Sequence, residues 1–327
     1  MPKPPSRTAP TARLSEADLA PLDDSVRIWP GTHVQLGATR VHVRTTPTTA
    51  DNAEPALFVH GLGGSAHNWT DFAGVLRNRL AVEAIDLLGH GRSGAAPGNE
   101  YSLPANARTV IAYLEQSARG PVHLVGNSMG GAVSILVASQ RPDLVRTLTL
   151  ISPAVPDNRV RVYPLRNDPR VALLAVPVVG EFALRKMNSR LAPEVRAKGT
   201  IALCFADPSR YPAQRMREAV AEARDRLQVP WADSAFLRSM RGLAKTQLLR
   251  GRTGWTTLRS IKAPTLVLWG DTDRLVAPDL APYVAAAIPN SRLLVMEHIG
   301  HTAMMEDPRG SARALLGLIE DAPGTKS

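Results

Sequence analysis

The chain alternates short, almost continuous apolar runs with segments of helical periodicity. Runs of six to nine apolar residues bounded by Gly, Pro or polar residues are typical of strands that are buried on both faces of a parallel sheet. Such runs occur at 56–61, 81–89, 121–128, 145–152, 265–270 and 292–298. Further upstream, residues 33–46 alternate between apolar and polar positions around Gly37, which predicts an antiparallel pair of strands.

Helical segments separate these apolar runs. Strands that alternate with helices favour a mostly parallel α/β sheet with helices on both faces. The predicted helices cover 69–78, 104–119, 129–140, 278–287 and 308–320. The pattern therefore predicts an α/β core formed by residues 26–153 and 259–327.

Residues 154–258 interrupt this alternation. They carry helical patterns, many arginines and repeated prolines, but no convincing strand pattern. We expect a helical cap (a lid) inserted between two strands of the sheet. Ligands of open α/β sheets bind beyond the carboxyl ends of the strands, so a cap inserted there would cover the site.

Residues 1–25 hold several prolines among small polar residues and predict a disordered or loosely packed leader. No apolar stretch follows its basic residues, so a secretory signal is not expected. The longest apolar run, 171–179, is far shorter than the ~20 residues that span a bilayer. These features predict a cytoplasmic protein, peripheral at a membrane if it contacts one.

The distribution of charge along the chain indicates which classes of partner to expect. The 327 residues carry 39 Lys and Arg against 29 Asp and Glu, a net charge of +10. Residues 155–260 hold 20 of those basic and 9 of those acidic residues, so the remainder of the chain has a net charge of −1. Because the basicity belongs to the cap alone, it does not indicate a nucleic-acid partner. The single cysteine, Cys204, excludes an intrachain disulfide and a cysteine-built metal site.

The segment Gly126-Asn127-Ser128-Met129-Gly130-Gly131 follows an apolar run directly and precedes a predicted helix. This is the G-x-S-x-G nucleophile elbow in its required strand–turn–helix context. Glycines are needed there because the turn is tight, and Ser128 is raised at a helix N-terminus, where free N–H groups favour negative charge. Ser128 is therefore the predicted nucleophile.

A serine nucleophile needs a base, and the base needs a carboxylate that orients it. Each should follow a late strand, with the acid before the histidine. Asp273 follows the strand 265–270 and His301 follows the strand 292–298, in that order. Asp271 and His298 compete for these roles. Asp273 is favoured by its spacing from Gly270, and His301 by its place after Gly300, beyond the strand end.

A tetrahedral intermediate also needs hydrogen-bond donors for its oxyanion. The segment His60-Gly61-Leu62-Gly63-Gly64-Ser65 follows the first predicted parallel strand, where a donor loop should lie. The backbone N–H groups of Leu62 and Met129 are the candidates. For His60 we expect a structural role in ordering the loop. No metal or cofactor is required by this chemistry.

Together with the segment Asp86-Leu87-Leu88-Gly89-His90-Gly91-Arg92-Ser93, these motifs closely resemble the α/β-hydrolase family over residues 30–320. The resemblance implies a central sheet with an inserted cap. A serine nucleophile argues against the dehalogenase and epoxide-hydrolase branches. Capped carboxylesterases and monoacylglycerol-lipase-like enzymes remain, as do the carbon–carbon bond hydrolases that act on aromatic meta-cleavage products. The carbon–carbon hydrolases typically have a G-P-G oxyanion loop and an aromatic residue just after the histidine. This sequence has Gly63-Gly64-Ser65 and Thr302 at those places.

The expected function is hydrolysis of carboxylic esters through an acyl-enzyme. The apolar run 171–179 in the cap favours an apolar, lipid-like acyl group, such as a monoacylglycerol or a medium-to-long acyl ester. That run could line the acyl pocket, or it could enter a membrane interface while the neighbouring arginines meet anionic headgroups. A cap arginine that binds an anionic substrate group is a third possibility. A non-catalytic binding protein of the same fold is the alternative of a different class.

Overall fold

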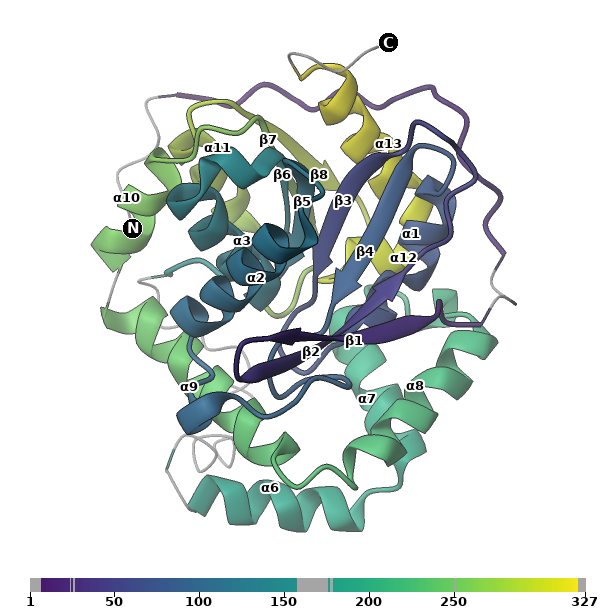
Figure 1. Cartoon of the computed structure of the whole chain (residues 1–327), viewed down its shortest axis with the longest axis vertical. Coiled ribbons are helices and arrows are strands. Elements are labelled where there is room, and N and C mark those ends of the chain that lie inside the picture. Colours follow the sequence, from purple (N-terminus) through teal and green to yellow (C-terminus); the bar gives the residue numbers. More distant parts are fainter. Residues whose placement is uncertain are drawn as a thin grey trace.

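The computed structural model describes residues 7–23, 25, 27–157, 176, 179–249 and 251–322. Its centre is an eight-stranded sheet in the order β1-β2-β4-β3-β5-β6-β7-β8 (Figure 1). Strand β2 runs antiparallel to both β1 and β4, and the remaining pairs are parallel. The prediction of a mostly parallel sheet that begins with an antiparallel pair is confirmed. The strands are β1 (Gly31–Leu36), β2 (Thr39–Thr45), β3 (Glu54–Val59), β4 (Leu80–Ile85), β5 (Val122–Asn127), β6 (Val145–Ile151), β7 (Thr265–Gly270) and β8 (Ser291–Met296).

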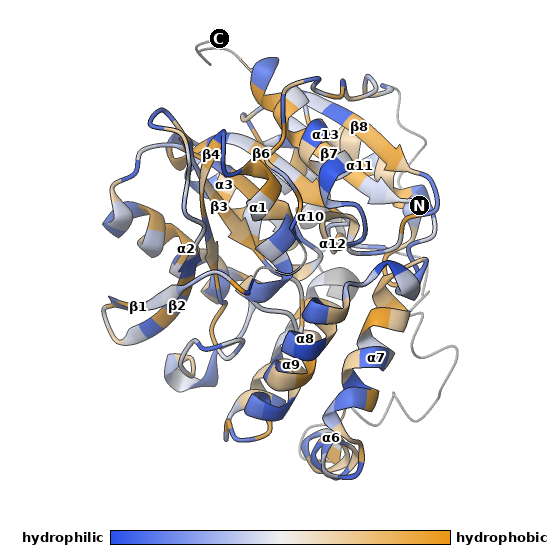
Figure 2. Cartoon of the chain, turned by 90° about the vertical axis from the view of Figure 1, so that its right-hand side faces the viewer, coloured by the Kyte–Doolittle hydropathy of each residue, from blue (hydrophilic) through white to orange (hydrophobic). Residues whose placement is uncertain are grey.

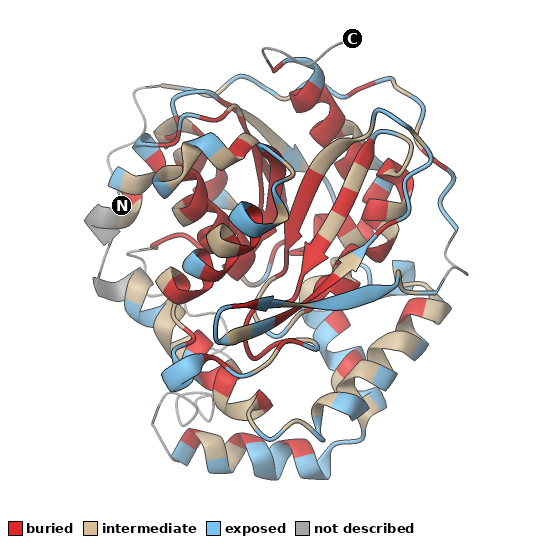
Figure 3. Ribbon diagram, in the orientation of Figure 1, coloured by how far each residue is buried: buried red, intermediate tan, exposed pale blue. Residues whose placement is uncertain are grey.

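Helices cover both faces of the sheet and enclose two apolar cores. One core lies against α2, α3, α10 and α11, and the other lies against α1, α12 and α13 (Figures 1 and 3). Every residue of β5 and β7 is buried, because each of these strands has a helical layer on both sides. The helices are α1 (Thr70–Leu76), α2 (Leu103–Ser117), α3 (Met129–Gln140), α10 (Gly251–Arg259), α11 (Ala281–Ala287), α12 (Ala303–Glu306) and α13 (Pro308–Glu320).

Four further helices, α6 to α9, form a separate group at one end of the molecule (Figure 1); we call them the inserted helices. They contact the loops that follow β3 and β8, since Phe236 of α9 packs against Gly63 and the end of α7 against Gly300. Within the described part of 154–258 the structure contains helices and no strand. The inserted helices are α6 (Val179–Arg190), α7 (Pro193–Cys204), α8 (Ala213–Arg226) and α9 (Ala232–Leu249).

The predicted cap, residues 154–258, ends within helix α10. Trp255 and Leu258 of α10 are buried in the core that lies against α3, as is Ala235 of α9. The sequence pattern cannot distinguish an amphipathic helix that covers the sheet from one that belongs to the insertion. The apolar run 171–179 lies outside the described residues except for Val176 and Val179.

The prediction of a disordered leader over residues 1–25 is wrong for the segment 7–22. Thr11 forms a parallel bridge to Leu293 of β8, and Ala12 N–H donates to the Leu293 carbonyl at 2.9 Å. Ser15 and Ala20 are buried, at 2% and 6% exposure. Strand β8 is an edge strand, so its unpaired backbone groups offer hydrogen bonds to any extended chain beside it. Proline is compatible with such an edge position, and composition alone therefore misled the prediction.

Candidate active site

Ser128 lies in the sharp turn between β5 and α3. Its backbone adopts φ 55° and ψ −117°, a strained conformation for a residue with a side chain. The turn is held by Ser128 N–H, which donates to the Ile151 carbonyl of β6 at 3.0 Å. A Cβ at Gly126 would lie 2.4 Å from the Gly130 carbonyl oxygen, and one at Gly130 would lie 2.1 Å from the Val59 carbonyl oxygen. Both positions therefore require glycine, which is the steric condition for a nucleophile elbow.

Asp273 and His301 are hydrogen-bonded to each other beyond the ends of β7 and β8. The distance from His301 Nδ1 to Asp273 Oδ2 is 2.8 Å, and the two residues are only 4% and 7% exposed. The other carboxylate oxygen accepts from the N–H groups of Leu275 at 2.8 Å and Val276 at 3.0 Å. A carboxylate only accepts, so Nδ1 carries the proton and Nε2 keeps its lone pair in the neutral ring. In this tautomer, Nε2 of His301 is left as the hydrogen-bond acceptor of the ring.

Asp271 and His298, the alternatives to Asp273 and His301, make other contacts. Asp271 is exposed and accepts from its neighbour Thr272 at 2.7 Å. His298 is also exposed, with a positive φ of 56°, and its carbonyl accepts from Arg210 at 3.2 Å. No hydrogen bond links either residue to the Asp273–His301 pair among the described residues. The geometry therefore joins Asp273 to His301, the pair that the loop spacing favours.

Two features bring the turn that carries Ser128 close to the loop that carries His301, which we call the histidine loop. The side-chain amide of Asn127, directly before Ser128, donates to the carbonyls of His301 and Ile151, each at 3.1 Å. Gly270 at the end of β7 allows the histidine loop to approach, because a Cβ there would lie 2.2 Å from the Ile299 carbonyl oxygen. Within the described residues the Ser128 hydroxyl forms no hydrogen bond to His301. Such contacts are often loose in ligand-free sites and tighten when substrate binds.

The loop after β3 lies beside Ser128. A Cβ at Gly61 would be 3.1 Å from the Ser128 Cβ, so the Gly61–Leu62 backbone passes next to Ser128. Met129 begins α3, and its N–H therefore has no partner inside the helix. His60 is fully buried; its Nε2 accepts from Leu87 N–H at 3.0 Å and its Nδ1 donates to the Gly61 carbonyl at 2.7 Å. Burial lowers the pKa of His60, so this ring is neutral and orders the loop.

The segment around Asp86 supports this loop from behind. Asp86 Oδ1 accepts from Ala66 N–H at 2.6 Å, and Oδ2 accepts from His42 Nδ1 at 2.8 Å and Arg92 N–H at 3.0 Å. The Ser93 hydroxyl donates to the Asp86 carbonyl at 2.6 Å. These groups are hydrogen-bonded to one another. Their arrangement fits a structural role.

A family model described as the alpha/beta hydrolase fold matches residues 55–308, well over half of the chain. The chain belongs to the α/β-hydrolase family. Its eight-stranded, mostly parallel sheet with flanking helices is the architecture of that family. The fold predicted for this α/β-hydrolase is therefore confirmed.

Relatives of this α/β-hydrolase include esterases and a hydrolase of another kind. It is 24% identical to a monoacylglycerol lipase of Xenopus laevis over 84% of this chain and 77% of the relative. It is 27% identical to a 2-hydroxy-6-oxo-6-(2'-aminophenyl)hexa-2,4-dienoic acid hydrolase of Metapseudomonas resinovorans, over 85% and 88% of the two chains. Among solved structures, a bacterial membrane phospholipase A is similar in fold, with a TM-score of 0.72 at 23% identity over 90% of this chain and 87% of that one.

One residue beside the candidate site escaped the sequence analysis. Glu306 of α12 has a completely buried side chain, and it accepts N–H groups from Gly300 at 2.7 Å, Ala206 at 3.0 Å and Asp207 at 2.9 Å. The hydrolase thereby ties the histidine loop to the segment that follows α7. His301 N–H itself donates to the Cys204 carbonyl at 2.7 Å. The available signal was a carboxylate directly after the apolar residues 303–305.

The thiol of Cys204 lies in low-dielectric surroundings at this junction. Burial, together with the negative charge of Asp273, raises the pKa of the thiol to about 12. The described part of the hydrolase contains no group of three His, Cys, Asp or Glu residues that could hold a metal ion. Among the described helices, none has both the length and the apolar character needed to span a bilayer.

Proposed function

We propose that this α/β-hydrolase is a serine esterase in which Ser128, His301 and Asp273 form the catalytic triad. One observation carries the proposal: Asp273 fixes the proton of His301 on Nδ1, which leaves Nε2 as the base, at the edge of the sheet where the strained Ser128 turn lies. Asn127 links the two loops through its bond to the His301 carbonyl at 3.1 Å. The esterase and lipase relatives support ester hydrolysis as the reaction class.

In the proposed reaction the Ser128 hydroxyl attacks the ester carbonyl while His301 Nε2 takes its proton. The N–H groups of Leu62 and Met129 bind the oxyanion of the tetrahedral intermediate. The carbon–oxygen bond to the alcohol then breaks, and His301 returns the proton to the leaving alkoxide. Water attacks the acyl-enzyme with His301 again as base, which releases the acid and restores Ser128. Asp273 stabilises the imidazolium in both steps.

The proposed substrates are apolar esters, such as monoacylglycerols or medium-to-long acyl esters. Names of relatives favour this class, since a monoacylglycerol lipase and a Psychrobacter immobilis lipase match more than 70% of their own lengths. The relative from Metapseudomonas resinovorans keeps carbon–carbon bond hydrolysis as the second candidate. Both reactions would use the same serine and histidine, so substrate selection distinguishes them.

Hydrolysis of p-nitrophenyl esters from acetate to palmitate, together with a monoacylglycerol, tests the proposal, with Ser128→Ala as control. We expect turnover that increases toward medium or long chains and is lost in the variant. Labelling of Ser128 by a fluorophosphonate measures nucleophile activation independently of the substrate. Labelling without ester turnover would favour the carbon–carbon hydrolase, which a dienoic meta-cleavage product would then assay. Absence of labelling in folded protein would favour a binding protein.

We further propose that helix α6 contacts anionic membranes. Phe182 and Met187 are 68% and 45% exposed, and Arg185, Lys186 and Arg190 are exposed on the same helix. Exposed apolar groups flanked by cations are the features of a helix that binds an anionic lipid surface. Figure 2 shows α6 at the end of the molecule that is farthest from the sheet, where a flat surface can reach it.

Sedimentation with phosphatidylglycerol and phosphatidylcholine vesicles tests this contact. We expect binding to the anionic vesicles alone, weakened by salt and by Phe182→Ser. Val295→Ser is the matched control, because Val295 is 41% exposed on strand β8, away from α6. Equal binding of both variants, or none by the unmodified protein, would contradict the proposal.

A further inference from the structure

A partly buried ionic cluster joins the inserted helices to the loop beside Ser128. The loop 60–65 leads directly into the short helix η1 (Ala66–Trp69), and Ser65 caps that helix. The Ser65 hydroxyl accepts from His67 N–H at 3.2 Å, and Ser65 N–H donates to Asn68 Oδ1 at 2.8 Å. Because these bonds fix η1 to the end of the loop, a displacement of η1 would displace the loop.

His67 of η1 lies between two carboxylates of α8. Its Nε2 is 3.1 Å from Glu218 Oε2, and its Nδ1 is 3.1 Å from Glu222 Oε2. A neutral imidazole can donate from only one nitrogen, so two carboxylates at this distance require the doubly protonated ring. Burial disfavours that cation, but the hydrogen bonds to Glu218 and Glu222 outweigh it and raise the pKa of His67 to about 9.

The two carboxylates are held as anions in return. Burial alone would raise the pKa of each, but hydrogen bonds, above all from His67, lower the pKa of both Glu218 and Glu222 to about 2. The Ser65 side chain contributes to the lowered pKa of Glu222, which places the end of the loop near α8. Arg226 of α8 and Arg44 of β2 add positive charge near Glu222.

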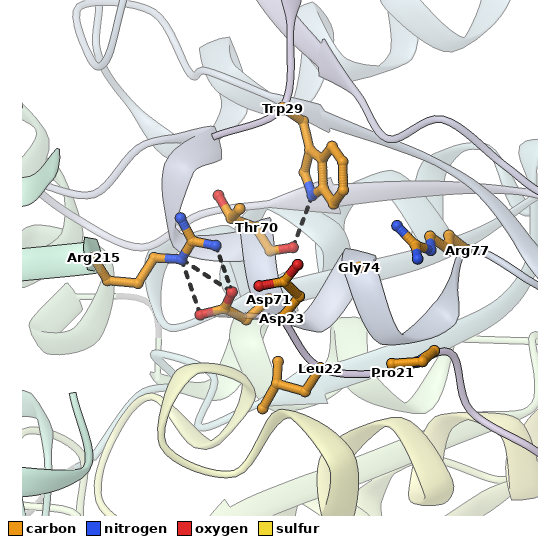
Figure 4. A pocket seen from close by; sticks show the side chains of 9 residues that line it. All are labelled: Pro21, Leu22, Asp23, Trp29, Thr70, Asp71, Gly74, Arg77 and Arg215. Atoms are coloured by element: carbon orange, nitrogen blue, oxygen red, sulfur yellow. Dashed lines mark hydrogen bonds and ion pairs between the residues drawn. The ribbon is translucent and has the colours of Figure 1, made fainter. Parts of the chain in front are cut away.

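A second ion pair anchors the same helix to α1. Arg215 of α8 is buried, and its guanidinium donates to Asp71 through Nη2 at 2.7 Å and through Nε at 3.0 Å (Figure 4). Its Nη1 donates to Glu218 at 2.6 Å, which orients that carboxylate toward His67. Helix α8 is therefore fixed at two successive elements, η1 and α1. Charge-assisted bonds of this kind are directional, so they set a position as well as an energy.

The tip of the loop meets another inserted helix. A Cβ at Gly63 would lie 3.1 Å from Cε2 of Phe236 in α9, and Gly63 has a positive φ of 74°. The loop is thus bounded by α9 at its tip and clamped by α8 at its end. Leu62, directly before Gly63, carries one of the two N–H groups that we assign to binding the oxyanion. A displacement of 1 Å at such a donor can reduce the rate by ~10²-fold.

We propose that His67, Glu218 and Glu222 form a clamp through which the inserted helix α8 positions the loop 60–65, and with it the Leu62 N–H group, for catalysis. His67 and Glu222 are then positioning residues, and this inference rests on the proposed serine esterase function. If the loop is fixed only while α8 is docked against η1, efficient turnover requires that the inserted helices stay packed against the sheet domain.

The variants Glu222→Gln and His67→Gln test the clamp. The matched control is Glu194→Gln, which removes the same charge from the inserted helices at the exposed Glu194–Arg224 pair, 3.4 Å apart. We expect Glu222→Gln to lower kcat roughly 10-fold with KM within about twofold, since misplacing a donor affects the transition state more than substrate binding. Hydrogen exchange of the backbone amides in 61–66 should accelerate in this variant and stay unchanged in Glu194→Gln.

The double variant His67→Gln with Glu222→Gln provides the second test if the single variants fold poorly. It removes the cation and one anion together, while Glu218 keeps its partner Arg215. The same loss of kcat and loop protection is expected. Unchanged exchange in 61–66, with kcat equal to that of Glu194→Gln, would overturn the clamp. If the unmodified protein hydrolyses no ester, the proposed function fails, and the exchange comparison alone decides on the clamp.

Discussion

Replacing Glu306 by glutamine should destabilise the protein strongly although the change is only one of oxygen for NH₂. The Glu306 side chain is completely buried. Its Oε2 accepts from Gly300 and Ala206, and its Oε1 accepts from Asp207, at 2.7, 3.0 and 2.9 Å. A glutamine has only one accepting oxygen, so its NH₂ group must face at least one of these N–H donors.

The magnitude follows from these three bonds. In the better orientation one buried N–H loses its acceptor, which costs about 1–3 kcal/mol. The two remaining bonds change from charge-assisted to neutral and lose roughly half their strength. Together these losses give about 2–4 kcal/mol of unfolding free energy. For a chain of this size that corresponds to a decrease in Tm of roughly 3–6 °C.

Urea and thermal unfolding of Glu306→Gln measure this loss, and Glu297→Gln is the control. Glu297 is an exposed carboxylate in the same strand-to-helix connection, so its substitution should change the unfolding free energy by less than about 0.5 kcal/mol. Titration of active serine with a fluorophosphonate reports the histidine loop separately. Equal unfolding midpoints for the two variants would refute the assignment of Glu306 as the anchor of that loop.

Three further predictions concern the elbow, the clamp and the thiol. Gly130→Ala should cost more than about 3 kcal/mol or prevent folding, because its Cβ would lie 2.1 Å from the Val59 carbonyl oxygen; circular dichroism and unfolding curves measure this, and a native midpoint would contradict it. The folded pKa of His67 is about 9, above the ordinary 6.5, so its contribution is complete below pH 6.5 and is lost as the pH rises through 9. The difference in unfolding free energy between wild type and His67→Gln should therefore be on the order of 3 kcal/mol at pH 6 and small at pH 10, and a pH-independent difference would exclude this titration. Cys204, whose pKa is raised to about 12, should react with iodoacetamide at pH 8 about 10³-fold more slowly in the folded than in the urea-unfolded protein, as followed by mass spectrometry; a rate within tenfold would contradict the raised pKa.

The amino-acid sequence by itself determined the sheet and the candidate residues at its edge. Continuous apolar runs such as 265–270 indicate strands covered on both faces, because no exposed face remains for polar residues. The glycines on either side of Ser128, between an apolar run and a helical pattern, indicate a tight strand-to-helix turn. The order of Asp273 and His301 after late strands places both at one edge, and the structure joins them at 2.8 Å.

Tertiary structure alone decided which distant groups meet. The segment 7–22 has the composition of a disordered leader, yet it is ordered because β8 is an edge strand with free backbone groups. Helix α10 follows the inserted helices in the chain, and its Trp255 and Leu258 are buried in the core beside α3. Glu306 and His67 carry no local signal for their distant partners, because those partners lie on the segment that follows α7 and on α8. Local sequence patterns indicate whether a segment is buried. The pairing of distant charged groups depends on how whole helices dock against one another. Nearby sequence does not encode that docking.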